Sequence, residues 1–514
     1  MARKVRVAVS SLALLSGILL YLLCPAIATG EVSERPVPSE GEELKLTLQD
    51  CVSFAMKNNL EIRVSEIIPK ISEAEIVQEK SKFDPVALLS ASQNKSLIDS
   101  TTILQGVFAR GEKRFVQKGI DVDFSLAEKL MTGGKAELSY SSNRYETNSI
   151  FQLVNPAYRS DLTFSMIQPI LRNFGIDLNR SKIRIASNNR LLSLDQLKDR
   201  ATKVVCAAEE TYWGLILTHR LLEVRKKSLQ LAENLLERNR GLVEVGKLPS
   251  VEILQAQVGV ASREEEAITA ESRVREVEDL LKELLNLPLK GQEIIPLDQP
   301  TFEPLQADLE ASLESAYHNR PDYHQASVNI DNIEILTKIA KNQMLPGVDL
   351  KASYGLNGIS GEYGDTWDKI GDAHTYSWFV GLNIDVPLGN RFAKNEFVKR
   401  KLDKEKASLI MEGLKKRIEV EVRDATRDVN TALKRIEASK QARVLSEERL
   451  KAEEERLGLG LTTSVEVLRF QESLAVAESR EITAVIDYLK AWVNLSKVTG
   501  TALAKNKIEI EESK

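Results

Sequence analysis

The segment VGKLPSVE at residues 245–252 recurs as LGLTTSVE at residues 459–466, which is 214 residues further along the chain. Each copy joins two long stretches of helical composition and therefore predicts a tight turn between two helices. A second pair of segments, 52–92 and 313–353, aligns without gaps at an offset of 261 residues. The matching segments occur in the same order in both halves of the chain. A period this long does not fit a solenoid and indicates a duplicated domain.

The two repeats are expected to share one plan, in which a helix, a β segment, a very long helix and a returning helix follow one another. Pro85 and Pro346 end the first helix of each copy. In the first repeat, at 44–287, the elements are a helix at 44–84, a β segment at 86–170, a long helix at 178–245 and a return helix at 250–287. In the second repeat, at 306–501, they are a helix at 306–345, a β segment at 348–387, a long helix at 392–459 and a return helix at 464–501.

Apolar residues in the two long helices recur every seven positions. The matched columns are Leu215, Leu222, Leu229, Leu236 and Val243 in the first repeat, and Val429, Ile436, Arg443, Leu450 and Leu457 in the second. Sevenfold spacing keeps one stripe facing a neighbouring helix, so the pattern predicts coiled-coil packing. At the rise of an α-helix, each long helix reaches roughly 100 Å. Helix content alone would favour an ordinary coiled-coil scaffold.

The N-terminus has the features of a secretory signal. A basic start with Arg3, Lys4 and Arg6 precedes an apolar core at 7–23 and the small-x-small sequence Ala26-Ile27-Ala28. This order predicts a cleaved signal peptide at 1–28, and the alternative is an uncleaved anchor. A flexible segment is expected at 29–43. After residue 28 no apolar run approaches the roughly 20 residues of a transmembrane helix, so a mature chain that crosses a membrane has to use a closed barrel.

Several segments alternate apolar and polar residues in the period-2 manner of β-strands. The candidates are 86–93, 120–127, 135–142, 161–169, 348–355 and 377–386. Alternation fits a barrel wall with lipid on one side and water on the other. It fits a half-buried sheet in a soluble protein equally well.

The aromatic residues favour the barrel. Of 28 aromatic residues, 18 fall within 83–174 and 354–397, and barrels concentrate aromatic side chains at the membrane interfaces. One chain offers four to six strands, whereas a closed bacterial barrel has at least about eight and an open edge cannot face lipid. Several subunits must then share one barrel.

Composition and motifs argue against catalysis, metal binding and nucleic-acid binding. The net charge is only −5, so no basic surface for nucleic acid is expected. The four histidines lack metal-ligand spacing, and the glycines at 358–364 lack the Walker lysine and serine. No catalytic, metal-binding or cofactor-binding residue is therefore assigned. Cys24 falls within the signal, and whether Cys51 and Cys206 pair is left open.

Several short motifs, each weak by itself, occur together in order. They are residues 48–59, QPILRNFG at 168–175, VPLGNR at 386–391 and the two turn segments at 245–252 and 459–466. Over roughly residues 44–501 the chain resembles the TolC-type outer-membrane efflux family, the outer membrane factors. The resemblance implies a mostly α, α+β fold, in which a periplasmic α-barrel of long antiparallel coiled-coil helices is joined to a trimeric transmembrane β-barrel with four strands per subunit.

One segment departs from the pattern of that family. The first repeat carries an insertion at 94–160, which could enlarge the barrel, plug it or cover its mouth. An extra hairpin is the favoured interpretation. The Pro-rich linker at 288–305 and the tail at 502–514 resemble the family's equatorial girdle around the tunnel.

The resemblance also implies partners and a site. The expected partners are two further copies in a homotrimer, outer-membrane lipid, a periplasmic adaptor (membrane fusion) protein and an inner-membrane pump of the RND or ABC type that supplies the energy. The chain would be a passive duct of a tripartite efflux or type I secretion system, for small molecules or proteins. The alternative is a periplasmic coiled-coil scaffold or adaptor protein without a membrane-spanning barrel.

The resemblance places the gate at the helix-turn tips. Glu252 and Glu466 are expected to line or brace the periplasmic entrance, and Arg469, one turn after Glu466, is expected to pair with it. Pro249 stands where a helix start tolerates proline, and Ser250 or Ser464 could cap the return helices. The residues expected to contact the adaptor are Gly246, Pro249, Ser250, Gly460, Thr463 and Ser464.

Overall fold

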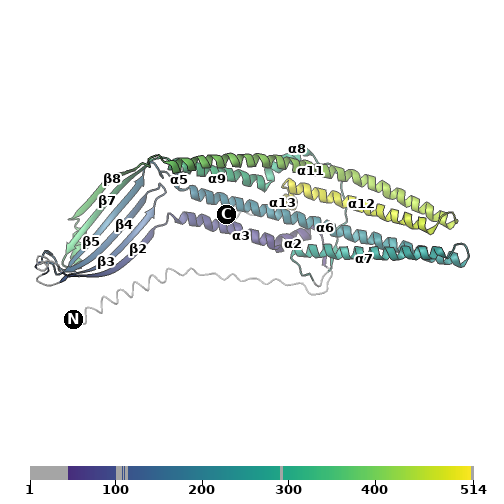
Figure 1. Cartoon of the computed structure of the whole chain (residues 1–514), viewed down its shortest axis with the longest axis horizontal. Helices are drawn as coiled ribbons and strands as arrows, with labels where there is room; N and C mark the ends of the chain where they lie inside the picture. The colour runs from purple at the N-terminus through teal and green to yellow at the C-terminus, as the bar shows by residue number, and fades with distance from the viewer. Residues whose placement is uncertain (1–43, 100–106, 108, 110–113, 290–292, 511–514) are drawn as a thin grey trace, which may run out of the picture. The chain divides into compact units, whose positions relative to one another are not determined.

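The computed structural model describes residues 44–99, 107, 109, 114–289 and 293–510. The predicted signal peptide at 1–28 and the segment at 29–43 lie outside these residues. The described part combines long helices with an antiparallel sheet (Figure 1). The mostly helical α+β class predicted from the sequence is confirmed.

The first helical stretch of each repeat is broken in two. The helices are α2 (Leu48–Asn58) and α3 (Leu60–Ser81) in the first repeat, and α8 (Leu309–Asn319) and α9 (Pro321–Gln343) in the second. The single helices predicted at 44–84 and 306–345 are therefore wrong. Asn59 has an extended backbone, and its side-chain oxygen accepts hydrogen bonds from the backbone N–H groups of Glu61 and Ile62, at 2.9 and 3.3 Å, so it caps a new helix. In the second repeat Pro321 follows the break and disfavours a helical backbone at Arg320.

Two very long helices each pair with a returning helix. They are α6 (Ser181–Glu244), preceded by the short α5 (Ile176–Asn179), with α7 (Val251–Leu285), and α11 (Arg391–Gly458) with α12 (Ser464–Val498). In α11 the predicted sevenfold column is buried at Val429, Ile436, Leu450 and Leu457. Within the described ranges, none of the helices combines the length and apolar composition that a membrane crossing requires.

The strands form one antiparallel sheet with the order β2-β3-β4-β5-β7-β8 (Figure 1). The strands are β2 (Val86–Asp99), β3 (Arg114–Lys129), β4 (Lys135–Thr147), β5 (Ala157–Pro169), β7 (Gly347–Ser360) and β8 (Tyr376–Asp385). Each of the six predicted strands overlaps one of them. The insertion in the first repeat contains the hairpin β3–β4, and a short helix, α10 (Tyr363–Gly371), lies between β7 and β8.

The two faces of this sheet differ in polarity. Residues that pair directly across neighbouring strands share a face, and alternate residues along a strand lie on opposite faces. The register therefore places on one face Leu89, Val122, Phe124, Leu138, Leu162, Phe164, Leu350, Val380 and Leu382. It places on the other face Ser90, Asp121, Asp123, Ser139, Ser141, Thr163, Ser165, Asp349, Lys351 and Asn383. We call these the apolar face and the polar face. The polar face also carries the apolar residues Val86, Leu88, Ile98, Phe115, Ile167, Ile359 and Phe379.

The linker and the tail are fastened to the middle of α6. Strand β1 (Leu44–Leu46) pairs in parallel with β6 (Ile294–Pro296). The hydroxyl of the fully buried Tyr212 donates to Asp298 Oδ2 at 2.7 Å and also lies 3.0 Å from the backbone oxygen of Leu46. In the tail, which contains α13 (Ala502–Lys505), the side-chain amide of Asn506 donates to Glu209 at 2.6 Å. Both segments thus pack against the same long helix.

The two described cysteines do not form a disulfide. Cys51 and Cys206 are buried and free. Burial raises the pKa of each thiol to about 12, so both stay protonated at neutral pH.

Replacing Tyr212 by Phe tests the fastening of the linker. The change leaves Asp298 and the Leu46 carbonyl without this donor inside the core, so the free energy of unfolding should fall by roughly 1–3 kcal/mol. Thermal unfolding of the purified protein measures the loss. Tyr317→Phe, at an exposed tyrosine, is the matched control and should change little. Equal midpoints for Tyr212→Phe and the unchanged protein would contradict the assignment.

Candidate functional site at the helix-turn tips

Both long helices end in the same glycine turn. Gly246 and Gly460 have φ angles of 71° and 73°. In the first turn the Lys247 N–H donates to the Leu242 oxygen at 2.8 Å and the Gly246 N–H donates to the Val243 oxygen at 2.9 Å, which is the Schellman pattern. The second turn repeats it around Gly460. The left-handed backbone of the turn therefore explains each glycine by itself, without a contact to another protein.

The predicted serine caps are absent. Neither Ser250, at the start of α7, nor Thr463, at the start of α12, makes a side-chain capping hydrogen bond, and Ser464 is the first residue of α12. At α12 the N-terminal N–H group of Ser464 is instead capped from the other repeat. Pro249 accepts a backbone hydrogen bond from the Glu252 N–H at 3.1 Å, in the first turn of α7.

Glu252 supplies that cap. The Glu252 carboxylate oxygen Oε2 accepts a hydrogen bond from the backbone N–H of Ser464 at 3.0 Å, and Glu252 is only 7% exposed. A negative charge at a helix N-terminus is stabilised by the helix dipole and by free N–H groups. The side-chain amide of the buried Asn239 donates to Ser464 Oγ at 2.8 Å and to the Glu252 backbone oxygen at 3.3 Å. The tip of the first repeat is thus bound to the tip of the second.

Glu466, the counterpart of Glu252 in the second repeat, lies in a different environment. It forms the predicted ion pair with Arg469. Its side chain is 38% exposed, and that of Arg469 is 61% exposed. The Arg469 guanidinium also lies over the ring of Phe470, 5.1 Å from its centre. One glutamate therefore braces the tips from inside, while the other is accessible.

A layer of polar contacts joins the same helices further from the tips. The buried Arg263 of α7 donates to Ser228 Oγ of α6 at 3.0 Å and to the backbone oxygen of Leu468 of α12 at 2.9 Å. Burial lowers the pKa of Arg263, against the opposing effect of nearby glutamates. Arg225 of α6 pairs with Glu266 of α7 at 2.9 Å. Sequence reasoning missed Asn239, Arg263 and Arg225, because no local pattern shows which polar residue of a long helix faces another repeat.

Comparison with known proteins gives a family and a fold. Residues 312–501, in the second repeat, match the family described as Outer membrane efflux protein. The second repeat belongs to the outer membrane efflux protein family. The TolC-type resemblance predicted from the sequence is thereby confirmed.

Solved structures extend the likeness to the first repeat. The Campylobacter jejuni CmeC outer membrane channel is 16% identical, with a TM-score of 0.63 over 94% of this chain and 92% of that chain. The open state of the Neisseria gonorrhoeae MtrE outer membrane channel is 16% identical, with a TM-score of 0.61 over 94% and 98%. The Vibrio cholerae outer membrane protein VceC is 16% identical, with a TM-score of 0.61 over 88% and 96%. No curated sequence matches the chain significantly. At these identities the likeness shows a shared fold.

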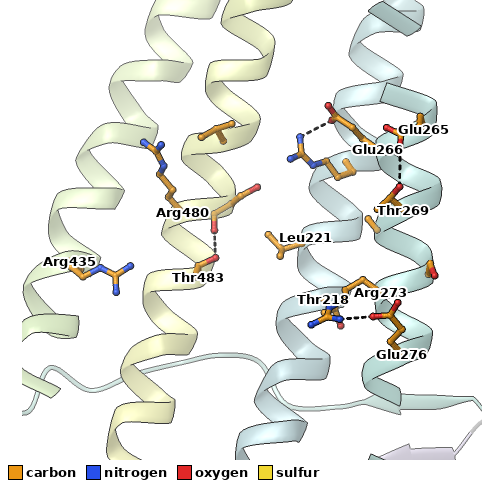
Figure 2. A pocket seen from close by; sticks show the side chains of 15 residues that line it. Thr218, Leu221, Glu265, Glu266, Thr269, Arg273, Glu276, Arg435, Arg480 and Thr483 are labelled. Carbon is orange, nitrogen blue, oxygen red and sulfur yellow. Dashed lines mark hydrogen bonds and ion pairs between the residues drawn. The ribbon is translucent and has the colours of Figure 1, made fainter. Parts of the chain in front are cut away.

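A groove separates the two helix pairs of this chain. Figure 2 shows side chains from α6 and α7 on one side of it and from α11 and α12 on the other. Its volume is about 760 Å³. The charged residues that line it are Arg225, Glu265, Glu266, Arg273, Glu276, Arg435 and Arg480. Across the described residues, no group of three or more His, Cys, Asp and Glu side chains is placed to hold a metal ion. The contacts that the tips offer are hydrogen bonds and ion pairs between helices, which can form or be released.

Replacing Asn239 by Ala tests the bridge between the tips. The change removes the donor to Ser464 Oγ and to the Glu252 backbone oxygen, so the local free energy of opening at the tips should fall by roughly 1–3 kcal/mol. Hydrogen exchange of the backbone amides at 251–256 and 464–469 measures this opening and should be faster. Arg240→Ala, next to it on the exposed surface, is the control and should leave exchange unchanged. The bridge is disproved if the two variants exchange alike.

Proposed function

We propose that this chain is the outer-membrane channel subunit of a tripartite export system, and that three copies close one transmembrane β-barrel. The observation that carries the proposal is the apolar face of the sheet. Phe164, Val380 and Leu382 on this face are 50%, 62% and 56% exposed. An exposed apolar surface that extends across all the strands of the sheet needs an apolar partner, and lipid is the partner that fits an alternating sheet.

The edges of the sheet support assembly. Within the described part of the chain, β2 and β8 are the two edge strands, and β2 is exposed along all 14 of its residues. Free backbone N–H and C=O groups of an edge strand are costly in lipid. Because each neighbour in the sheet is antiparallel and the number of strands is even, β2 and β8 run in opposite directions. The β2 of one copy can therefore pair with the β8 of the next in the antiparallel sense of the rest of the sheet.

The helices would form the periplasmic part of the duct. The helices α6 and α11 have 64 and 68 residues. At the α-helical rise each spans roughly 100 Å, so a ring of such helices continues the barrel far from the membrane. The duct would be passive, serving small molecules in efflux or proteins in type I secretion, with energy from an inner-membrane pump of the RND or ABC type.

The tips would receive the adaptor protein. Apolar side chains next to both glycine turns are exposed, with Val245 at 67%, Leu459 at 75% and Leu461 at 64%. A Cβ atom added at Gly246 or Gly460 would meet open space. The turns therefore offer an accessible, largely apolar contact surface, to which Pro249, Ser250 and Thr463 are adjacent. Ser464 is fully buried and bonded to Asn239 and Glu252, so the prediction that it contacts the adaptor is wrong.

The same tips would act as the gate. Glu252 and Asn239 hold the two helix pairs of one subunit together, whereas the accessible Glu466 and its partner Arg469 line the entrance. In a trimer, three Glu466 side chains near the axis would favour cations, and pairing with Arg469 reduces that charge. Release of the contacts between the helix pairs would let the entrance widen.

A pair of arginine substitutions on β5 tests the membrane location. Phe164 lies on the apolar face, and Ser165, the next residue, lies on the polar face. Phe164→Arg should prevent stable assembly, because an arginine facing the middle of the bilayer costs about 2–4 kcal/mol per subunit. Ser165→Arg should be tolerated. Outer-membrane fractionation and trimer bands in unheated gel samples measure the assembly of both variants. If the unchanged protein is a soluble periplasmic monomer, the result instead supports the scaffold alternative.

Replacing Glu252 by Ala tests the gate. Losing a helix-capping carboxylate costs about 1 kcal/mol, which corresponds to roughly a fivefold shift towards the open entrance. Single-channel recordings in planar bilayers should show a higher open fraction. Glu252→Gln keeps a hydrogen-bond acceptor and should have a smaller effect. An open fraction that stays the same in Glu252→Ala would rule out the bracing role.

A further inference from the structure

The β3–β4 hairpin lies inside the sheet, where the family pattern has no strands. It lies between β2 and β5 (Figure 1), and the described residues give six strands where the resemblance implies four. The ladder between β2 and β3 runs from the pair Val86–Ala127 to the pair Asp99–Arg114, so it covers the whole of β2. The ladder between β4 and β5 runs from the pair Lys135–Ile167 to the pair Tyr145–Ala157. A plug or a cover over the mouth would leave β2 and β5 free to pair with each other, which the hairpin prevents.

The hairpin has the same two faces as the rest of the sheet. On the apolar face it carries Ile120, Val122, Phe124, Leu126 and Leu138. On the polar face it carries Asp121, Asp123, Ser125, Glu137, Ser139 and Ser141. A hairpin surrounded by water would have no reason to continue this division in register with β2 and β5. The pattern is that of a wall with lipid on one side and water on the other.

The turn of the hairpin is fixed to the junction between sheet and helices. The Gly175 N–H donates to the Thr132 backbone oxygen at 3.1 Å, and Thr132 Oγ1 donates to Gln168 Oε1 at 2.8 Å. Gly133 has a φ angle of 97°, and a Cβ atom there would lie 2.2 Å from the Asn173 backbone oxygen. The turn therefore packs closely against the segment that leads from β5 to α5.

At the other end of the strands, α10 contacts β4 of the hairpin. Trp367 of α10 stacks on Tyr140 of β4, with ring centres 4.8 Å apart. The Thr366 hydroxyl lies 2.9 Å from the Ser160 hydroxyl of β5, in a buried contact. A helix that starts near the end of β7 is thus in contact with β5 and β4 together. Both ends of the hairpin are integrated into the sheet.

We infer that β3 and β4 are part of the barrel wall, so that the trimer closes with three times six, or eighteen, strands. This inference rests on the proposed function. Barrel diameter grows roughly in proportion to strand number, so the barrel is about 1.5 times as wide as one with four strands per subunit. Barrels of roughly 16–18 strands leave an aqueous channel, and this one is lined by the polar face.

The helical part does not widen with the barrel. Four strands connect directly to long helical segments, because β2 follows α3, β5 leads to α6, β7 follows α9 and β8 leads to α11. The hairpin adds two strands and no helix. The helices, rather than the barrel, therefore limit the size of the cargo, and the barrel accommodates any solute or polypeptide that the helical duct passes.

Cryo-electron microscopy of the full-length trimer in lipid nanodiscs tests the strand count. The expected result is eighteen strands, with residues 114–147 in the wall. A twelve-stranded barrel with these residues in its lumen or outside it overturns the inference and leaves the proposed function standing. An unchanged protein that does not fractionate with the outer membrane overturns both.

Arginine substitutions in the hairpin give a second test. Phe124→Arg, on the apolar face, should reduce assembled trimer in the outer membrane at least tenfold. Ser125→Arg, on the polar face, should stay within about twofold of the unchanged protein. Equal tolerance of the two substitutions would show that the hairpin does not face lipid, and would overturn the inference even if the strand count were unresolved.

Discussion

The backbone groups along the outer edges of β2 and β8 require hydrogen-bonding partners. The strands of the sheet alternate apolar and polar side chains. If water covered both faces, apolar residues such as Phe164 and Val380 would be exposed to it. A lipid environment satisfies the apolar face and makes unpaired edges costly. Assembly with further copies satisfies the edges. In the proposed trimer the arrangement of the helices follows, because four strands of each copy connect to helices and would bring the helical segments of all copies around one axis.

Features with a local cause could be predicted from the sequence. The period-2 alternation located all six strands, and the repeated turn segments located Gly246 and Gly460, whose left-handed backbone favours glycine. Features that depend on contacts distant in the sequence could not. The sequence predicts a continuous helix through Asn59, because its role as a cap needs an extended backbone that composition does not show. The sequence offers Ser464 as a possible cap of α12, whereas the cap is Glu252, which only the fold brings within 3.0 Å of the Ser464 N–H.

The two repeats have kept one plan and have diverged at the tips. Glu252 and Glu466 occupy equivalent positions, yet one is buried as a cap and the other is paired with Arg469 at the surface. Asn239 reaches across to Ser464, whereas its equivalent, Glu453, accepts a hydrogen bond from Thr462 of its own turn at 2.5 Å. If the two tips were symmetric, each would donate the same set of contacts to the other. Here one set of contacts joins the repeats and leaves the other tip accessible.

The position of the β3–β4 hairpin bears on how such proteins change over time. The segment that contains the hairpin begins after Asp99, the end of β2, and ends before Ala157, the start of β5, and both of these residues lie at the end of the strands remote from the helices. Between β2 and β5, strands can therefore be gained or lost two at a time. Such a change does not alter the chain direction of β5 or of the helix α6 that follows it. In the proposed channel, the bore of the membrane part and the fit of the periplasmic part to its partners would therefore be encoded in separate segments. If the proposed function holds, a lineage could widen its outer pore and keep the same pump complex.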